Sequence, residues 1–312
     1  LMTVILILKF KRNGKKYIIS ITLYTVGFLI LISGPWVRTG AEVTMLDVGQ
    51  GDCAHLKADG GVNLMFDSGG SDTYDVGTNT LIPYFLANGV SEIDLAVVSH
   101  LHQDHCGGLR TMTQGVDVRR LLLSAVYEPE ADSVAEDLGI PKEYMIFAAA
   151  GDSFEIGGGR LTVLAPERSD EKTYRKILED SEDENELCLV VRAEYKGRSV
   201  LFTGDIGADY EKELAKGLNG AAEKPRADIL KVAHHGSRYS TCDAFLSAVA
   251  PKAAVIQVGR NYYGHPSEEV IQRIEKLGAA VFRNDLQGAI LMRLGKNIGI
   301  SSVKETRKRE IQ

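Results

Sequence analysis

Short apolar runs alternate with polar turns over most of the chain, and their spacing predicts a mixed α/β domain over residues 41–300. Residues 43–47, 54–56 and 62–67 predict strands, because apolar positions there are separated by glycine-rich turns. A strand is also predicted at 94–98, where Asp94 is followed by the unbroken apolar run 95–98, which is typical of a strand buried on both faces. This strand leads directly into a cluster of histidines.

The later part of the domain alternates strand-like and helix-like runs. Further strands are predicted at 119–124, 161–165, 187–195, 199–203, 229–233, 253–258, 280–283 and 289–293, and helices at 79–88, 208–217, 242–249 and 267–277. Two runs of strands, each accompanied by helices, favour sheets packed face to face with helices outside. The charged segment 301–312 is expected to be a frayed tail.

The amino-terminal part has a different pattern. Residues 17–34 lack any charge, which is near the minimum length for crossing a hydrocarbon core of ~30 Å. We interpret them as a transmembrane helix and the apolar residues 1–8 as the truncated end of another. The basic cluster at 9–16 places the loop in the cytoplasm and the domain on the extracytoplasmic side of the cell membrane. A signal peptide is disfavoured, since an apolar run precedes the basic cluster; a buried helical hairpin stays open.

Composition sets two limits. All 42 acidic residues but only 30 of the 36 basic residues lie in 41–312, which therefore has a formal charge of about −12. That balance disfavours a general nucleic-acid binder. The four cysteines, Cys53, Cys106, Cys188 and Cys242, show no paired spacing, so buried thiols are expected. One or two disulfides remain open if the domain lies outside the cytoplasm.

Residues 100–105, which read His-Leu-His-Gln-Asp-His, are the strongest chemical signal. The first two histidines share one face of the strand end by the two-residue period. The Asp-His pair after them is expected to reach a second ion through a tight turn at Gly107 and Gly108. Imidazole and carboxylate ligands suit zinc, manganese or iron and leave room for water. Another pair, His234 and His235, follows a later predicted strand.

Residues 100–105 match the HxHxDH signature of the metallo-β-lactamase superfamily at every defined position, and the chain resembles that family over nearly all of 41–295. The resemblance implies a four-layer αββα sandwich with one or two metal ions at the strand ends. Asp67 matches the family's early aspartate, which orients the site through hydrogen bonds. Asp205 matches the strand-end aspartate that bridges two metals, and residues 234–237 match a later histidine motif.

Three segments narrow the resemblance. Residues 45–52 (MLDVGQGD), 234–237 (HHGS) and 263–267 (YGHPS) are similar to the carboxyl-terminal domain of the ComEC-type competence family. That family's membrane proteins import single-stranded DNA, and their extracellular domain is proposed to degrade the other strand. The resemblance implies a nuclease acting in DNA uptake (natural transformation). DNA is then the expected substrate, and the remainder of a polytopic channel protein is the expected partner.

The chain departs from the superfamily at one ligand. No histidine occurs between positions 106 and 233, where an isolated third histidine is usual. ComEC-like proteins often have an asparagine-rich pattern there, of which only Asn185 is kept. The first metal site is therefore expected to be poor in nitrogen ligands, which favours Mn²⁺ while Zn²⁺ stays allowed.

The resemblance implies two divalent metal ions, Mn²⁺ or Zn²⁺, that activate a shared hydroxide. The expected metal ligands are His100, His102, Asp104, His105, Asp205 and His235. The expected catalytic residues are Asp104, Asp205 and His234. His234 would contact the substrate phosphate or protonate the leaving oxygen, and its role could be exchanged with that of His235. Supporting or substrate contacts are expected from Gln50, Asp52, Asp67, Asn185, Ser237 and His265.

Several of these side chains also have structural interpretations. His265 could simply fix its loop, and residues 49–52 have the composition of a plain glycine turn. His55 alternates with apolar neighbours, which favours a structural histidine. Lys231 and Arg238 flank the histidine pair and could contact phosphates, although flanking charges usually face solvent.

Three functions are compatible with these patterns. The first is a metal-dependent phosphodiesterase or nuclease that degrades one DNA strand. The second is an extracellular metallo-hydrolase of a phosphorylcholine-type ester or a lactone, which the acidic domain makes a serious rival. The third is a non-catalytic domain that only packs against its channel.

Overall fold

The computed structural model describes residues 14–33, 40–180, 184–217, 225–304 and 309–311. It divides into two units, residues 1–39 and 40–312. The first unit contains helix α2 (Gly14–Ser33). Among the described residues, no helix combines the length and the apolarity needed to cross a membrane, so α2 does not confirm the predicted span. The second predicted span, at 1–8, lies outside the described residues.

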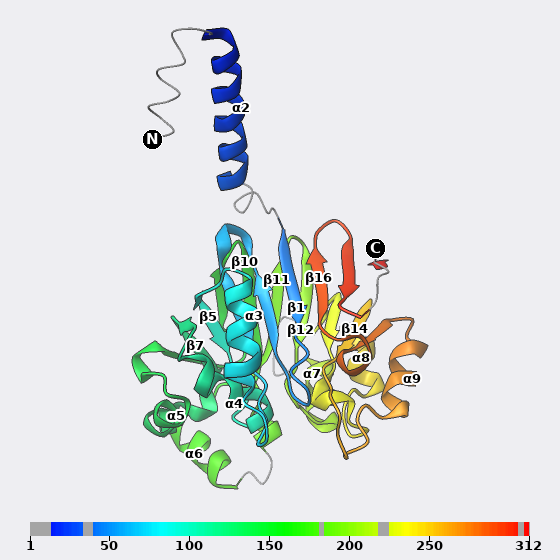
Figure 1. Ribbon diagram of the computed structural model, residues 1–312. Helices are drawn as coiled ribbons and strands as arrows, with labels where there is room; N and C mark the ends of the chain where they lie inside the picture. Colours follow the sequence, from blue (N-terminus) through cyan, green and yellow to red (C-terminus); the bar gives the residue numbers. More distant parts are fainter. Residues whose placement is uncertain (1–13, 34–39, 181–183, 218–224, 305–308, 312) are drawn as a thin grey trace. The chain divides into compact units, whose positions relative to one another are not determined.

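The second unit contains two large β-sheets (Figure 1). The first sheet contains, in spatial order, β18 (Arg309–Ile311), β17 (Ile298–Ser302), β16 (Ile290–Leu294), β1 (Ala41–Met45), β2 (Ala54–Lys57), β3 (Asn63–Phe66), β5 (Leu95–Val97), β7 (Leu121–Ser124) and β8 (Met145–Ala148). The second contains β15 (Ala280–Arg283), β14 (Ala253–Ile256), β13 (Ile229–Lys231), β12 (Arg198–Phe202), β11 (Val190–Tyr195), β10 (Gly159–Ala165) and β9 (Ser153–Ile156). A short ribbon pairs β4 (Glu92–Ile93) with β6 (Asp117–Val118).

Helices flank the two sheets on their outer sides (Figure 1). Those beside the first sheet are α3 (Ile82–Ala87), α4 (Gln103–Met112), α5 (Ala131–Leu138) and α6 (Glu171–Asp180). Those beside the second are α7 (Ala208–Lys216), α8 (Asp243–Val249) and α9 (Glu268–Lys276), and a short α10 (Asn284–Gln287) follows β15. Helix α9 shows how the sequence determines where a helix begins and which of its faces is buried. The Ser267 side chain caps its first turn by accepting from Val270 N, and Val270 and Ile274 are its buried positions.

Buried apolar side chains form one cluster between the sheets and one under each helical layer. In the central cluster, Phe66 of β3 stacks on Phe202 of β12 with ring centroids 3.8 Å apart. The order of layers is therefore helix, sheet, sheet, helix. This arrangement confirms the αββα sandwich that the sequence predicts.

The direction of the strands positions the site. In the first sheet β3, β5, β7 and β8 run parallel, and in the second β12, β13, β14 and β15 run parallel. Asp67 directly follows β3, and residues 99–105 follow β5. Asp205 follows β12, and His234 and His235 follow β13. The chemistry-bearing residues of both sheets thus leave their strands at carboxyl ends, as sites in α/β folds commonly do.

Two expectations about secondary structure are wrong, and several elements were not predicted. Gly107 and Gly108 lie inside α4 and not in a tight turn. They are small because the helix packs closely: a Cβ on Gly108 would lie 2.3 Å from the carbonyl oxygen of Ser68. The tail at 301–312 is not simply frayed, since residues up to 302 extend β17 and 309–311 form β18. Strands β8 and β9 and helices α5 and α6 were not predicted.

Candidate metal centre

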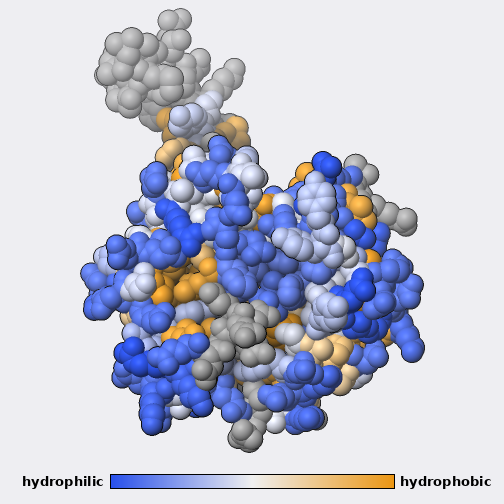
Figure 2. All heavy atoms as spheres, turned by 90° about the horizontal axis from the view of Figure 1, so that it is seen from below, coloured by the Kyte–Doolittle hydropathy of each residue, from blue (hydrophilic) through white to orange (hydrophobic). Residues whose placement is uncertain are grey.

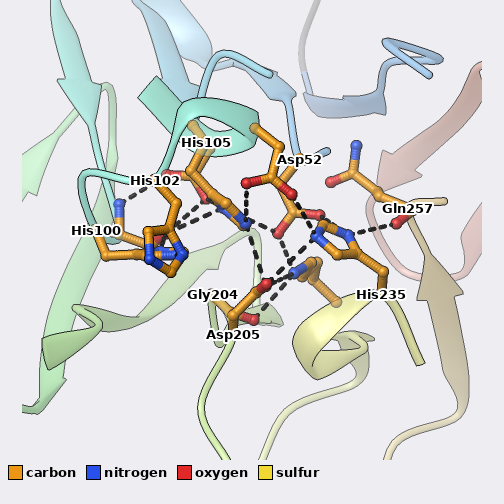
Figure 3. A network of polar contacts seen from close by, with 12 residues as sticks. Asp52, His100, His102, His105, Gly204, Asp205, His235 and Gln257 are labelled. Atoms are coloured by element: carbon orange, nitrogen blue, oxygen red, sulfur yellow. Dashed lines mark hydrogen bonds and ion pairs between the residues drawn. The ribbon is translucent and has the colours of Figure 1, made fainter. Parts of the chain in front are cut away.

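Four side chains from both sheets converge on one point (Figure 3). Asp104, His105, Asp205 and His235 each offer one ligand atom, and these atoms all lie within 4.8 Å of one another. Nε2 of His235 lies 3.2 Å from Oδ2 of Asp104 and 3.3 Å from Oδ2 of Asp205. Nε2 of His105 lies 3.3 Å from Oδ1 of Asp205. The structure therefore brings together four of the six predicted metal ligands.

Asp67 orients His105. Its Oδ2 atom lies 3.0 Å from Nδ1 of His105, so that Nε2 of the same ring faces the cluster. The carboxylate is held in turn by Ser99, whose backbone N donates to Oδ1 over 2.7 Å and whose hydroxyl donates to Oδ2 over 2.9 Å. A carboxylate behind a ligating imidazole fixes both its tautomer and its direction. Asp67 thus lies where the sequence predicts it, whereas Ser99 was not predicted.

Gln257 orients His235 in the same way. Nδ1 of His235 lies 2.8 Å from the backbone oxygen of Gln257. The Gln257 side chain donates from Nε2 to the carbonyl oxygens of Cys53, over 2.7 Å, and of Leu46, over 3.2 Å. It thereby ties the second sheet to the loop after β1. The sequence offers one signal for this residue, a single polar side chain inside the apolar run 253–258, which is too weak to predict a site residue.

The turn before Asp205 depends on Gly204. Its φ is +51°, and a Cβ there would lie 2.9 Å from both Sγ of Cys188 and Cβ of Ser99. The backbone N of Asp205 donates to Sγ of Cys188 over 3.3 Å. Close packing of these small groups directs the Asp205 carboxylate into the cluster. Cys188 therefore has a positioning role that its spacing did not indicate.

Lys231 is buried behind the cluster, with 2% of its side chain exposed. Its Nζ pairs with Asp52 at close range, lies 3.5 Å from Oδ1 of Asp205 and donates to the carbonyl oxygen of Gly204 over 3.0 Å. The expectation that this residue faces solvent is wrong, since its side chain is buried and paired with Asp52. Asp52 is part of a buried ion pair and not only of a glycine turn.

The cluster's chemistry fits a divalent cation. Nε2 of His105 and Oδ1 of Asp205 are buried and lie 3.3 Å apart, but neither atom makes a hydrogen bond. Burial alone would lower the pKa of His105, but the carboxylates of Asp205 and Asp52 outweigh it and raise that pKa to about 10. The same carboxylates raise the pKa of His235 against the effect of burial. Positive charge is therefore favoured at this point, and imidazole with carboxylate is a donor set for Zn²⁺ or Mn²⁺.

His100 and His102 lie beside the cluster, but their ligand set is smaller. Nε2 of His100 is 3.0 Å from Nδ1 of His102, and the His100 ring centroid is 4.2 Å from that of His105. Burial lowers the pKa of His100, which keeps this imidazole neutral. Within the described residues, no third His, Cys, Asp or Glu atom joins this pair within the same 4.8 Å limit. His100 and His102 thus form a pair beside the four-residue cluster and are not part of it.

His234 and His265 border the cluster on its outer side. His234 and His235 both have left-handed backbone, with φ near +50°, and their ring centroids lie 6.4 Å apart. The His234 and His265 centroids lie 5.7 Å apart, and both side chains are partly exposed. This exposure separates His234 from the buried His235, so the two histidines are not equivalent.

Of the other predicted site residues, Gln50 and Ser237 make hydrogen bonds within loops. Gln50 Oε1 accepts from the backbone N of Gly259 over 3.3 Å. The Ser237 hydroxyl accepts from the backbone N of Tyr239 over 3.3 Å. Asn185 is buried in the turn η5 (Glu184–Leu187). All four cysteines are free thiols.

Two known proteins are similar in sequence to most of this chain. "ComE operon protein 3" of Bacillus subtilis is 31% identical over 298 residues, which are 89% of this chain and 36% of that protein. "Competence protein ComA" of Neisseria gonorrhoeae is 30% identical over 259 residues, 82% of this chain and 33% of that protein. The chain thus spans about a third of the length of these relatives.

Solved structures support the fold alone. The metallo-beta-lactamase fold protein YhfI from Bacillus subtilis superposes with a TM-score of 0.53 at 11% identity, over 82% of this chain and 100% of that one. CmlA, a diiron beta-hydroxylase from Streptomyces venezuelae, gives 0.53 at 15% identity, over 83% of this chain and 55% of that one. The model of the metallo-beta-lactamase superfamily matches residues 46–260. The chain belongs to the metallo-beta-lactamase superfamily.

Proposed function

We propose that the chain is a metal-dependent phosphodiesterase that cleaves DNA during its uptake. One observation carries the proposal: Asp104, His105, Asp205 and His235 converge within 4.8 Å at the strand ends of both sheets. A bound divalent ion, Mn²⁺ or Zn²⁺, would supply charge neutralisation and an activated water there. The name of one relative, "Competence protein ComA", supports DNA as the substrate.

The chain's own residues divide the remaining work. Asp104 and Asp205 supply the carboxylates, while Asp67 and Gln257 hold the two imidazoles in the orientation that ligation requires. His100 and His102 would hold the second, poorer ion. His234 is the partly exposed imidazole nearest to His235, and we assign it to the substrate phosphate or to protonation of the leaving oxygen.

Membrane attachment through the amino-terminal segment belongs to the same proposal, with the hydrolase domain on the extracytoplasmic side and the rest of a channel protein as its partner. The uncharged stretch 17–34 behind a basic cluster supports it. Protease added outside intact cells should digest the domain in this orientation. Survival of the domain under those conditions contradicts it.

The test of catalysis is hydrolysis by the purified chain. We expect Mn²⁺ or Zn²⁺ to promote cleavage of single- or double-stranded DNA and of bis-p-nitrophenyl phosphate. Asp205→Asn and Asp104→Asn should abolish this activity without unfolding the protein. Asp209→Asn is the matched control, since its carboxylate is exposed and pairs with Lys212 on α7.

The rival functions give different results in the same assay. Cleavage of the small diester or of phosphorylcholine esters, but never of DNA, indicates another extracellular substrate. No hydrolysis with either metal favours a non-catalytic domain. Activity retained in both aspartate variants contradicts the assigned site.

A further inference from the structure

Two segments beside the metal cluster expose an unusual set of side chains. Residues 234–242 and 253–267 contain no acid, although the domain is acidic as a whole. They expose three tyrosines: Tyr239 is 76% exposed, Tyr262 94% and Tyr263 76%. They also expose Arg238 and Arg260. We call these three tyrosines and two arginines the tyrosine face.

The two segments lie against each other. The backbone N of Ser267 donates to the carbonyl oxygen of Gly236 over 2.8 Å. A Cβ on Gly236 would lie 2.6 Å from Cβ of Pro266, so the contact is tight. Arg273 of α9 ties the first segment from behind by donating to the carbonyl oxygens of Ser240 and Thr241. These contacts hold together the two segments that carry the tyrosine face.

The loop that presents Tyr262 and Tyr263 is held by a side chain and not by burial of its tyrosines. Asn261 donates from Nδ2 to the carbonyl oxygens of Gly259, over 3.0 Å, and of His265, over 2.8 Å. Its Oδ1 accepts from the backbone N of Tyr263 and of His265, each over 3.1 Å. Four hydrogen bonds thus fix the loop while both tyrosine rings remain in solvent. Such preorganisation lowers the entropic cost of binding a ligand there.

A series of rings connects the tyrosine face to the metal cluster. His235 belongs to the cluster, and His234 follows it at a centroid distance of 6.4 Å. His265 lies 5.7 Å from His234, and Tyr263 lies 5.9 Å from His265 at an interplanar angle of 30°. The steps are of the size expected between neighbouring aromatic groups. The rings therefore lead from the cluster outward to solvent.

We propose that the tyrosine face binds a single nucleic-acid strand through its bases and directs the backbone to the metal cluster. Exposed aromatic rings next to arginines are the means by which proteins bind unstacked bases and the adjoining phosphates. A duplex keeps its bases stacked inside and cannot use the rings. Neither segment contains an acidic residue, so the tyrosine face lacks the excess of negative charge that the domain has as a whole. The face of the molecule seen in Figure 2 is largely hydrophilic.

The inference rests on the proposed phosphodiesterase activity for its biological meaning. A measurement of binding tests it separately from that activity. Fluorescence anisotropy in chelator, where no hydrolysis occurs, compares the full chain's affinity for a labelled oligo-dT 12-mer and for an abasic strand of equal length. We expect oligo-dT to bind at least about tenfold more tightly, since stacking strengthens binding by that order per base. A duplex should bind more weakly than oligo-dT.

Three variants identify the rings. Tyr262→Ala/Tyr263→Ala should lose the preference for oligo-dT over the abasic strand, and Tyr262→Phe/Tyr263→Phe should keep it. Tyr144→Ala is the matched control, because Tyr144 is 41% exposed and precedes β8, at the opposite end of the strands from the site. Replacing Arg238 and Arg260 should reduce the slope of log affinity against log salt concentration by about 0.7 for each phosphate that is no longer neutralised.

The outcomes separate the two proposals. Any of three results overturns the proposed role of the tyrosine face. They are equal affinity for oligo-dT and the abasic strand, a preference for oligo-dT that survives in the double alanine variant, and tighter binding to anionic vesicles than to oligo-dT. If that result accompanies metal-dependent cleavage of bis-p-nitrophenyl phosphate, only the inference fails. Base-dependent binding without any hydrolysis supports the inference and removes the proposed activity.

Discussion

The Nζ atom of Lys231 lies 3.5 Å from Oδ1 of Asp205, while the same ammonium pairs with Asp52. Burial alone would lower the pKa of Lys231, but the two carboxylates outweigh it and raise that pKa, so the side chain is charged. One cation thus lies behind the metal cluster and compensates two of its acids. Loss of this cation would leave negative charge in a buried environment.

Lys231→Met should therefore lower the free energy of unfolding by about 3–5 kcal/mol, the usual cost of breaking a buried ion pair from one side. Urea denaturation in chelator measures it. Lys231→Met/Asp52→Asn should recover part of the loss, because it removes one stranded charge. Lys252→Met is the control: Lys252 pairs with Asp228 but is 40% exposed, so it should cost less than about 1 kcal/mol. Equal costs for the two lysines would contradict the interpretation.

Asp67→Asn should weaken metal binding by roughly 10- to 100-fold, because the carboxylate that orients His105 is lost while the ligand itself remains. Isothermal titration with Mn²⁺ or Zn²⁺ measures the affinity. Asp94→Asn is a suitable comparison, since its carboxylate contacts the backbone N of Asn63 and the Arg119 guanidinium instead of an imidazole. An unchanged affinity in Asp67→Asn would show that His105 is positioned by other contacts.

Gly51→Ala should also weaken metal binding, by a steric route. A Cβ on Gly51 would lie 2.4 Å from the backbone oxygen of Asp104, so the ligand must move. The matched control is Gly49→Ala in the same turn: Gly49 has a φ of +82°, but its Cβ would meet nothing within 4 Å. Both variants bear backbone strain, and only Gly51→Ala should lose metal affinity beyond that of the control. Equal losses would assign the effect to strain alone.

The stability of the fold should depend on His55 between pH 4 and 7. Burial lowers the pKa of His55 from 6.5 to about 4, while its ring stays bonded to Asn63 and Tyr84. In this window the unfolded chain binds more protons than the folded one, so stability falls as pH falls. His55→Gln should remove about 2 kcal/mol of the decrease between pH 7.5 and 5. Urea denaturation in chelator at both pH values compares the two proteins. Identical slopes would exclude this role.

The layers of the fold were predictable from sequence because they depend on local pattern. The apolar run at 95–98 is buried on both faces and contains β5, and the alternating runs around it form the two sheets. The error at α4 has a tertiary cause. Two adjacent glycines disfavour a helix by about 1 kcal/mol each, but the close approach of the Ser68 carbonyl oxygen requires glycine at position 108.

The site residues that belong to a recognisable motif were predictable from sequence. Those that tertiary packing brings to the site were not. Residues 100–105, Asp205 and His235 stand out by type and spacing. Asp52 and Lys231 were also candidates, but their buried ion pair was not predictable, because a charged side chain gives no local sign that a distant strand will bury it. Gln257 contacts His235 through its backbone oxygen, which every residue type possesses. The residue type therefore gives no indication of that contact.

The two halves of the metal cluster also set an order of events for the newly made chain. Asp104 and His235 are 131 residues apart, and each belongs to a different sheet. At a synthesis rate of about 5–20 residues per second, the second half emerges roughly ten seconds after the first. Until then residues 100–105 offer imidazoles to metal without the two partners that complete the cluster. The full set of four candidate ligands therefore forms only after the second sheet docks onto the first.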